Sequence, residues 1–126
     1  MAVGEVTVAF LDAFAEAWNR HDTDGILAAM TPDCVLETSV GPSVAGTRHV
    51  GQAETRDGIE ALFRQFPDAR WNDARHFTVD NRGVTEWVFT ATSRDGTRIE
   101  AQGCDVFTFR DGRIAVKNSY RKQRTA

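Results

Sequence analysis

The chain has 126 residues, of which 41% are hydrophobic, and its formal net charge at pH 7 is −3. This length supports one globular domain with a core, or with a core around a pocket. The charge gives no support for binding to nucleic acid or to an acidic membrane surface, because both need a basic surface. No apolar stretch approaches the ~20 residues of a membrane span, and no signal peptide is recognisable. We therefore expect a soluble, cytoplasmic protein in which Cys34 and Cys104 are free thiols.

Apolar residues recur at helical spacing in three segments. The first covers residues 4–20 and places Phe14 and Trp18 on its apolar face. Asp22 or Thr23 can cap a shorter second helix, which we expect Pro32-Asp33 to stop. The third helix is expected from about residue 53 to residue 66.

The remaining segments have the composition of strands. The predicted strands are residues 34–39, a short piece at 47–50 inside a glycine-rich loop, and residues 71–80, 84–94, 98–109 and 114–122. Turns are predicted at Asn81-Arg82-Gly83, at Asp95-Gly96 and at Asp111-Gly112. Helices followed by a run of antiparallel strands favour an α+β fold, with the sheet curled around the first and third helices. Its other face is then free for solvent or for a second subunit.

The predicted strand at 98–109 places an acid on an apolar face. Alternate residues of a strand share a face, and one such set is Ile99, Ala101, Gly103, Asp105, Phe107 and Phe109. A carboxylate there is costly unless it is paired, hydrogen-bonded or protonated. Asp105 is thus the main candidate for a functional residue, as a hydrogen-bond donor if protonated or a general base if ionised. The alternative is a structural ion pair or backbone network.

Lys117 lies across the predicted Asp111-Gly112 turn, close to the level of Asp105. The pattern alone does not decide which face of the last strand points inward, although the turn register favours the face that carries Lys117. An inward Lys117 would hold Asp105 ionised, whereas an outward one would be an ordinary surface lysine.

His76 and Glu86 flank the predicted Asn81-Arg82-Gly83 turn and are expected nearly opposite each other. Such a pair could perform acid–base chemistry near neutral pH. The alternative is a surface cross-strand pair without a catalytic role.

The order of the elements and the residues at their joints resemble the nuclear transport factor 2-like superfamily, in its SnoaL-like branch. The matching pieces are Trp18-Asn19-Arg20-His21-Asp22, Thr31-Pro32-Asp33-Cys34-Val35-Leu36, Gly51, Glu86-Trp87, Asp105 to Ile114, and Tyr120. The resemblance implies a cone-shaped α+β fold with an interior pocket, usually a homodimer through the outer sheet face. It also implies that Glu86, Val88, Thr90 and Thr92 point inward, while Trp87, Phe89 and Ala91 point outward, toward the interface.

The ketosteroid isomerases of this superfamily offer a residue-by-residue comparison. Their oxyanion-hole aspartate, which an apolar site keeps protonated, matches Asp105. Their general-base aspartate falls on Thr38, and the tyrosine of their first helix falls on or near Phe14. Because this chain lacks both the general-base aspartate and the tyrosine, it is not expected to perform ketosteroid isomerase chemistry.

These observations favour a small cofactor-free enzyme that acts as an isomerase, cyclase or hydrolase on a hydrophobic, carbonyl-bearing molecule. Asp105 would be its central acid or base, assisted by His76, Glu86 or Lys117. The expected substrate contacts are Phe14, Trp18, Thr38, Thr90 and Phe107. No metal site is expected, because His21, His49 and His76 lack ligand spacing. The alternatives are a non-catalytic binding protein that uses the same pocket, or a dimer with a filled interior.

Overall fold

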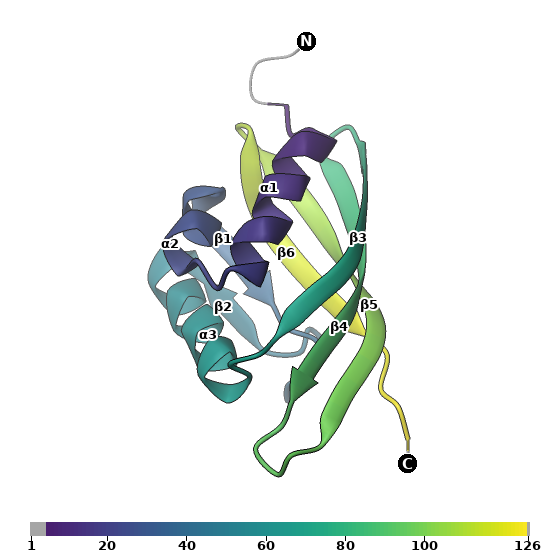
Figure 1. Ribbon diagram of the computed structural model, residues 1–126. Coiled ribbons are helices and arrows are strands. Elements are labelled where there is room, and N and C mark those ends of the chain that lie inside the picture. The colour runs from purple at the N-terminus through teal and green to yellow at the C-terminus, as the bar shows by residue number, and fades with distance from the viewer. Residues whose placement is uncertain (1–4, 126) are drawn as a thin grey trace.

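The structure is a computed structural model that describes residues 5–125, in which helices cover one face of a curved, unclosed sheet (Figure 1). The helices are α1 (Val8–Asn19), α2 (Thr23–Ala28) and α3 (Gly51–Gln65). The strands are β1 (Met30–Glu37), β2 (Arg48–Val50), β3 (Arg70–Val79), β4 (Arg82–Thr92), β5 (Arg98–Arg110) and β6 (Arg113–Arg121). The predicted α+β class and order of elements are confirmed.

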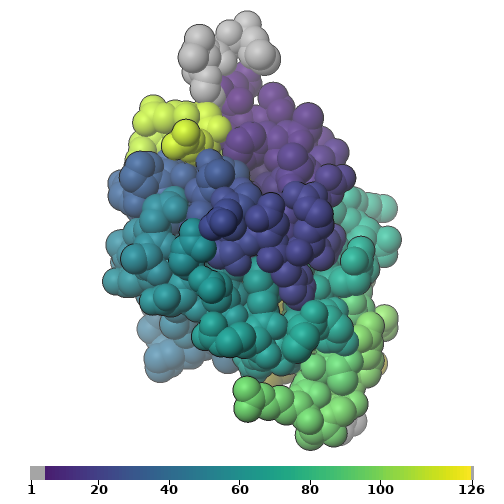
Figure 2. All heavy atoms as spheres, turned by 60° about the vertical axis from the view of Figure 1, so that its left-hand side comes forward, coloured from purple at the N-terminus to yellow at the C-terminus, as the bar shows by residue number. Residues whose placement is uncertain are grey.

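The strands form one sheet in the order β2-β1-β6-β5-β4-β3. Neighbouring strands are antiparallel except β1 and β6, which are parallel. Figure 1 shows α1 lying across the concave face of the sheet, with α2 and α3 beside it over β1 and β2. Figure 2, seen from the helical side, shows α1, α2 and α3 closing over this face, with the β4–β5 turn projecting beyond them. Among the described residues, no helix is long and apolar enough to span a membrane.

Local sequence explains most of the boundaries. The Thr7 side chain accepts a hydrogen bond from the backbone N–H of Phe10 at 3.1 Å, and Asp22 accepts one from Gly25 at 3.0 Å, so that each caps a helix. The expectation that Pro32 stops the second helix is wrong: α2 ends at Ala28, and Pro32 already lies in β1. The β1–β6 pairing is irregular between Met30 and Val35, and such an irregular stretch tolerates a residue without an N–H.

The predicted faces of β4 are wrong, because Trp87, Phe89 and Ala91 are buried in the core and Glu86 is exposed. A two-residue turn at Asp95-Gly96 would place Glu86 opposite Asp105. The chain instead pairs Thr92 with Arg98, so that Thr85 is opposite Asp105. A register shift of one residue moves every side chain to the other face.

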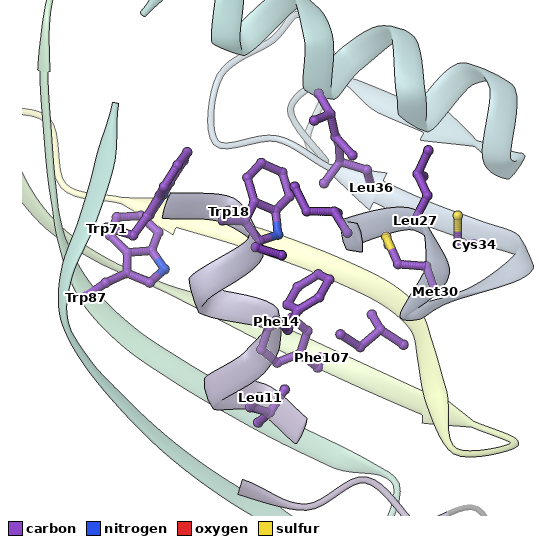
Figure 3. Packing of buried hydrophobic residues seen from close by; sticks show 14 of the residues in the cluster. Leu11, Phe14, Trp18, Leu27, Met30, Cys34, Leu36, Trp71, Trp87 and Phe107 are labelled. Carbon is purple, nitrogen blue, oxygen red and sulfur yellow. The ribbon is translucent and has the colours of Figure 1, made fainter. Parts of the chain in front are cut away.

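Aromatic side chains from α1 and from the sheet fill the space between these two layers (Figure 3). Phe14 packs edge-on against Phe107 with ring centres 5.9 Å apart, and Trp18 packs against Trp71 at 5.2 Å. Such contacts bury large apolar areas and favour edge-to-face geometry. The core therefore lies directly over the part of β5 that carries Asp105.

Candidate functional site

Asp105 lies at the centre of a buried polar cluster on the concave face of the sheet. Lys117 Nζ is 3.1 Å from Asp105 Oδ1, and the exposed fractions of the two side chains are only 6% and 8%, respectively. Ser119 donates its hydroxyl hydrogen to the same oxygen at 2.6 Å, and Trp87 Nε1 donates to Oδ2 at 3.0 Å. Lys117 also donates to Ser119 Oγ at 2.9 Å. Both carboxylate oxygens of Asp105 are thus held by donors.

The register of three strands assembles this cluster. Asp105 on β5 is opposite Thr85 on β4 and opposite Ser119 on β6, while Lys117 is one inward position further along β6. Of the two faces of β6 that the sequence left open, the one that carries Lys117 points inward, as the turn register favours. The roles of Ser119 and Trp87 were not foreseen. Ser119 could have been predicted, because it lies on the same face of β6 as Lys117. The inward position of Trp87 depends on the register between β4 and β5, which the loop between these two strands determines.

The pattern of donors fits an ionised carboxylate. A hydroxyl and an indole N–H donate to Asp105 and an ammonium group lies beside it, and both hydrogen bonds to the charged form and a nearby positive charge favour that form. The oxyanion-hole aspartate of the ketosteroid isomerases has the opposite requirement, because it must keep its proton in order to donate. The geometry here therefore favours a base or an anchoring carboxylate over an acid that donates a hydrogen bond.

A small cavity lies between this cluster and α1. Its volume is about 20 Å³, and Asp105, Lys117 and Thr85 contribute to its wall together with Phe14, Trp18 and Phe107. A cavity of this size holds about one water molecule. The structure therefore brings together five of the predicted site residues, namely Asp105, Lys117, Phe14, Trp18 and Phe107.

Trp18 has an unusual environment in the cavity wall. Lys117 Nζ lies 4.4 Å from the centre of its ring, a cation–π contact. Its buried Nε1 finds no hydrogen-bond partner among the described residues. Leaving a buried donor unpaired is costly, so the indole N–H of Trp18 is available to a water or a ligand oxygen.

His76 connects the surface to the cavity wall. Its Nδ1 is 2.7 Å from Thr85 Oγ1, and its Nε2 is 2.8 Å from Asp12 Oδ1 on α1. The His76 side chain is 3% exposed, whereas that of Asp12 is 67% exposed. The predicted His76–Glu86 pair is wrong, because the β3–β4 turn consists of Asp80-Asn81 instead of Asn81-Arg82-Gly83. His76 is therefore opposite Thr85, and Glu86 points outward.

Thr38 and Thr90 do not reach the cavity. The Thr38 hydroxyl donates to the carbonyl of Val40 at 2.8 Å and accepts from the N–H of Thr47 at 3.1 Å, so it shapes the β1–β2 connection. Thr90 lies on the face of β4 opposite to Phe89 and accepts a hydrogen bond from Asn72 at 3.0 Å. The inward orientation expected for Thr90 is wrong for the same register reason as for Glu86.

A broad groove of about 1390 Å³ crosses β3, β4, β5 and β6 and reaches the β1–β2 connection, and its lining includes both outward residues such as Glu86 and inward residues such as Ser119 and Arg121. Cys104 lies in it, and burial, followed by the charges of Asp105 and Glu86, raises the pKa of its thiol. Exposed apolar side chains on this sheet include Phe77, Val79 and Tyr120. Across residues 5–125, no group of three or more His, Cys, Asp or Glu side chains is arranged to hold a metal ion.

Comparison with known proteins gives a family and a fold. The family model described as SnoaL-like domain matches residues 11–117. No curated protein matches the chain. A proposed polyketide cyclase from Xanthomonas campestris has a similar solved structure, with a TM-score of 0.78 and 23% identity over 89% of this chain and 87% of that chain.

Two further solved structures support the same fold. An NTF2-like protein of unknown function from Burkholderia pseudomallei gives a TM-score of 0.80 and 20% identity, over 97% of this chain and 92% of that one. TerC, co-crystallised with polyporic acid, gives a TM-score of 0.74 and 21% identity, over 89% of this chain and 88% of that one. At these identities the likeness concerns the fold alone.

Proposed function

Because the chain belongs to the SnoaL-like domain family, we propose that it binds a hydrophobic, carbonyl-bearing small molecule and moves a proton on it, as an isomerase, cyclase or hydrolase. The observation that carries this proposal is the Asp105 carboxylate, which is held by three donors in the wall of a largely aromatic cavity. Pockets for small molecules combine an apolar lining with a few well-placed polar groups.

In this proposal Asp105 is the general base. Oδ1 is occupied by Ser119 and Lys117, whereas Oδ2 accepts only from Trp87 and keeps a lone pair, so it can accept a proton from a carbon next to a substrate carbonyl. The unpaired indole N–H of Trp18 is suited to donate to the carbonyl oxygen as negative charge develops there. Lys117 holds Asp105 in place and offsets its charge, and Phe14 and Phe107 supply apolar walls.

His76 gives the proton a route to solvent. Thr85 lies in the cavity wall opposite Asp105, and His76 joins its hydroxyl to the exposed Asp12. A histidine between two oxygen atoms can pass protons near neutral pH. Glu86 has no part in the proposal, since it points away from the cavity.

The size of the cavity sets a condition on this function. A volume of about 20 Å³ admits a water, whereas pockets for drug-sized molecules measure several hundred Å³. A substrate must therefore displace wall side chains from α1 or β3, with Trp18 and Trp71 as the largest of them. Ligand binding should change tryptophan fluorescence, because all three tryptophans of the chain, at positions 18, 71 and 87, lie in the wall.

Hydrogen–deuterium exchange tests the proposed proton transfer without a known product. 2-Tetralone, a hydrophobic cyclic ketone, is incubated in D₂O with the protein, and loss of its α-proton signals is followed by NMR. The protein should accelerate exchange, and Asp105→Asn should reduce the rate at least a hundredfold. Asp111→Asn is the matched control, because Asp111 is an exposed acid in the turn that directly follows the same strand. Equal exchange rates in wild type and Asp105→Asn would remove Asp105 from the mechanism.

The second candidate is a non-catalytic binding protein for a hydrophobic small molecule. It is favoured by Thr38 and Phe14, which replace the base and the phenol of the ketosteroid isomerases. Quenching of tryptophan fluorescence by hydrophobic ketones, without exchange above the rate of Asp105→Asn, would select this function.

We also propose that two copies associate through the outer face of the sheet. The support comes from exposed Phe77, Val79 and Tyr120 rather than from Trp87 and Phe89, which are buried inside the domain. Exposed apolar patches commonly mark interfaces. The cytoplasmic location and the independence from a cofactor stay predictions from the sequence.

A further inference from the structure

Lys117 is an exception among the basic residues of this chain. Of the 15 lysines and arginines in the sequence, only Lys117 and Lys122 are lysines. Lys117 is 5% exposed, whereas Lys122 and every arginine except the half-buried Arg121 are exposed. Arginine is the common cation of buried ion pairs and keeps its proton in proteins, while lysine can lose its proton and act as a nucleophile. The buried cation of this chain is therefore of the type that can react.

The contacts of the Lys117 ammonium group place it beside a proton acceptor and beside the cavity. Nζ is 3.1 Å from Asp105 Oδ1 and donates a hydrogen bond to Ser119 Oγ at 2.9 Å. It also lies 4.4 Å from the ring centre of Trp18, and Lys117, Asp105 and Trp18 all contribute to the cavity wall. A nucleophile next to a base that a third group holds in place is typical of covalent catalysis. Here the base is Asp105, which Ser119 and Trp87 hold.

We propose that Lys117 forms a Schiff base with the ligand, so that the ligand is a hydrophobic aldehyde or ketone with a hydrogen on the carbon next to its carbonyl group. This inference rests on the proposed interior binding site and narrows its substrate class, because esters, amides and carboxylic acids do not form Schiff bases with an amine. It also gives Lys117 a part in the chemistry beyond holding Asp105 in place.

The formation of the Schiff base needs only Lys117, Asp105 and the ligand. The ammonium group passes a proton to Asp105, and the neutral amine attacks the carbonyl carbon, so that a C–N bond forms and the π electrons move to the oxygen. The nitrogen loses a second proton to this oxygen, which gives a carbinolamine with a hydroxyl group. Asp105 then returns its proton to the hydroxyl group, which leaves as water while the nitrogen lone pair forms the C=N bond. The products are a protonated imine, an ionised Asp105 and one water molecule.

The protonated imine favours the proton transfer that we propose for Asp105. It withdraws electrons from the neighbouring C–H bond more strongly than a carbonyl group does, and Asp105 Oδ2 has a lone pair to accept the proton. Hydrolysis by the reverse steps releases the ligand and restores the ion pair. The oxygen of the released ketone then comes from water, whereas removal of an α-proton without a Schiff base leaves the original oxygen in place.

Oxygen exchange tests this assignment separately from α-proton exchange. 2-Tetralone, and cyclohexanone as a smaller ketone, are incubated with the protein in ¹⁸O-labelled water, and mass spectrometry follows the entry of the label into the carbonyl group. Wild type should accelerate this entry, and Lys117→Arg, which keeps the charge but does not form a Schiff base, should reduce the rate to that in buffer. The control Lys122→Arg should keep the wild-type rate, because Lys122 is exposed. Asp105→Asn should slow the exchange about a hundredfold, since it removes the group that takes and returns the proton.

Trapping with sodium borohydride locates the Schiff base without a variant. The reductant converts an imine to a stable secondary amine, so that peptide mass spectrometry should find the reduced ligand on Lys117, with Lys122 largely unmodified in the same sample. Circular dichroism and urea unfolding check that Lys117→Arg is folded.

The two exchange reactions together separate this inference from the proposed function. Exchange of α-protons in wild type without oxygen exchange and without an adduct on Lys117 would overturn the Schiff base and leave Asp105 as the general base. Oxygen exchange that requires Lys117, without α-proton exchange, would support the Schiff base and overturn the proton transfer by Asp105. An adduct mainly on Lys122, or an unchanged rate of oxygen exchange in Lys117→Arg, would overturn the role of Lys117. Absence of both exchange reactions would overturn both proposals.

Discussion

Replacing Lys117 by methionine tests how the buried cluster is held together. Methionine keeps most of the apolar stem of lysine and removes only the ammonium group. Asp105 would then remain as a buried carboxylate with Ser119 and Trp87 as its donors. Removing one partner of a buried ion pair typically costs about 3–5 kcal/mol, because the other charge stays desolvated without compensation.

The structure places the expected loss at the lower end of this range. The hydrogen bonds from Ser119 and Trp87 to Asp105 remain, and the methionine sulfur can pack against the Trp18 ring in place of the Lys117 ammonium group. We therefore expect Lys117→Met to lower the free energy of unfolding by about 3 kcal/mol at pH 7. The double variant Asp105→Asn/Lys117→Met removes both charges and should recover at least half of this loss.

Urea unfolding, followed by tryptophan fluorescence and circular dichroism, measures these differences. Lys122→Met is the control, because Lys122 directly follows β6 and is exposed, and surface changes of this kind usually stay within about 0.5 kcal/mol. A loss below about 1 kcal/mol in Lys117→Met would contradict the buried pair. So would a double variant whose loss equals the sum of the two single losses, since contacting residues should couple.

Three further predictions concern groups outside the cavity. The raised pKa of the Cys104 thiol should shift its alkylation by iodoacetamide to high pH, and Glu86→Gln should shift the profile downward by removing one of the charges that raise that pKa. Hydrogen bonds from Ser93 and from the N–H of Thr97 lower the pKa of Asp95 to about 2. Asp95 therefore stabilises the fold above about pH 4 and loses this effect as the pH falls toward 2, so the stability difference between wild type and Asp95→Asn should vanish over that range. Phe77→Asp should convert a dimer to a monomer in light scattering, and an unchanged mass would exclude the outer face around Phe77 as the interface.

The elements of the fold could be predicted because their signals are local. The helical spacing of Phe14 and Trp18 marks α1, and the Asp111-Gly112 dipeptide marks the turn between β5 and β6. The apolar alternation of β5 identified Asp105 as an inward acid, and the following short turn brought Lys117 to its side. The inward position of Asp105 and the nearby position of Lys117 can both be predicted from the sequence of this one hairpin.

The faces of β4 could not be predicted in this way, because they depend on the loop before β5. The backbone N–H of Ser93 bonds to the carbonyl of Thr97, and Asp95 accepts from Ser93 and Thr97 inside the loop. These contacts widen the loop beyond the two residues that Asp95-Gly96 would suggest. The register between β4 and β5 therefore shifts by one residue. That single shift placed Thr85 instead of Glu86 opposite Asp105, and it turned the neighbouring Trp87 toward Asp105.

This exchange changes the chemistry that Asp105 can perform. With Glu86 beside it, Asp105 would share its site with a second acid, and one of the two would have to be protonated. With Trp87 and Thr85 beside it, and with Lys117 and Ser119 on the other side, every nearby polar group can offer it a hydrogen. The position that matches the oxyanion-hole acid of the ketosteroid isomerases therefore holds a carboxylate that accepts hydrogen bonds, and the donor that a substrate carbonyl needs must come from elsewhere. The unpaired indole N–H of Trp18, across the cavity on α1, is suited to that part.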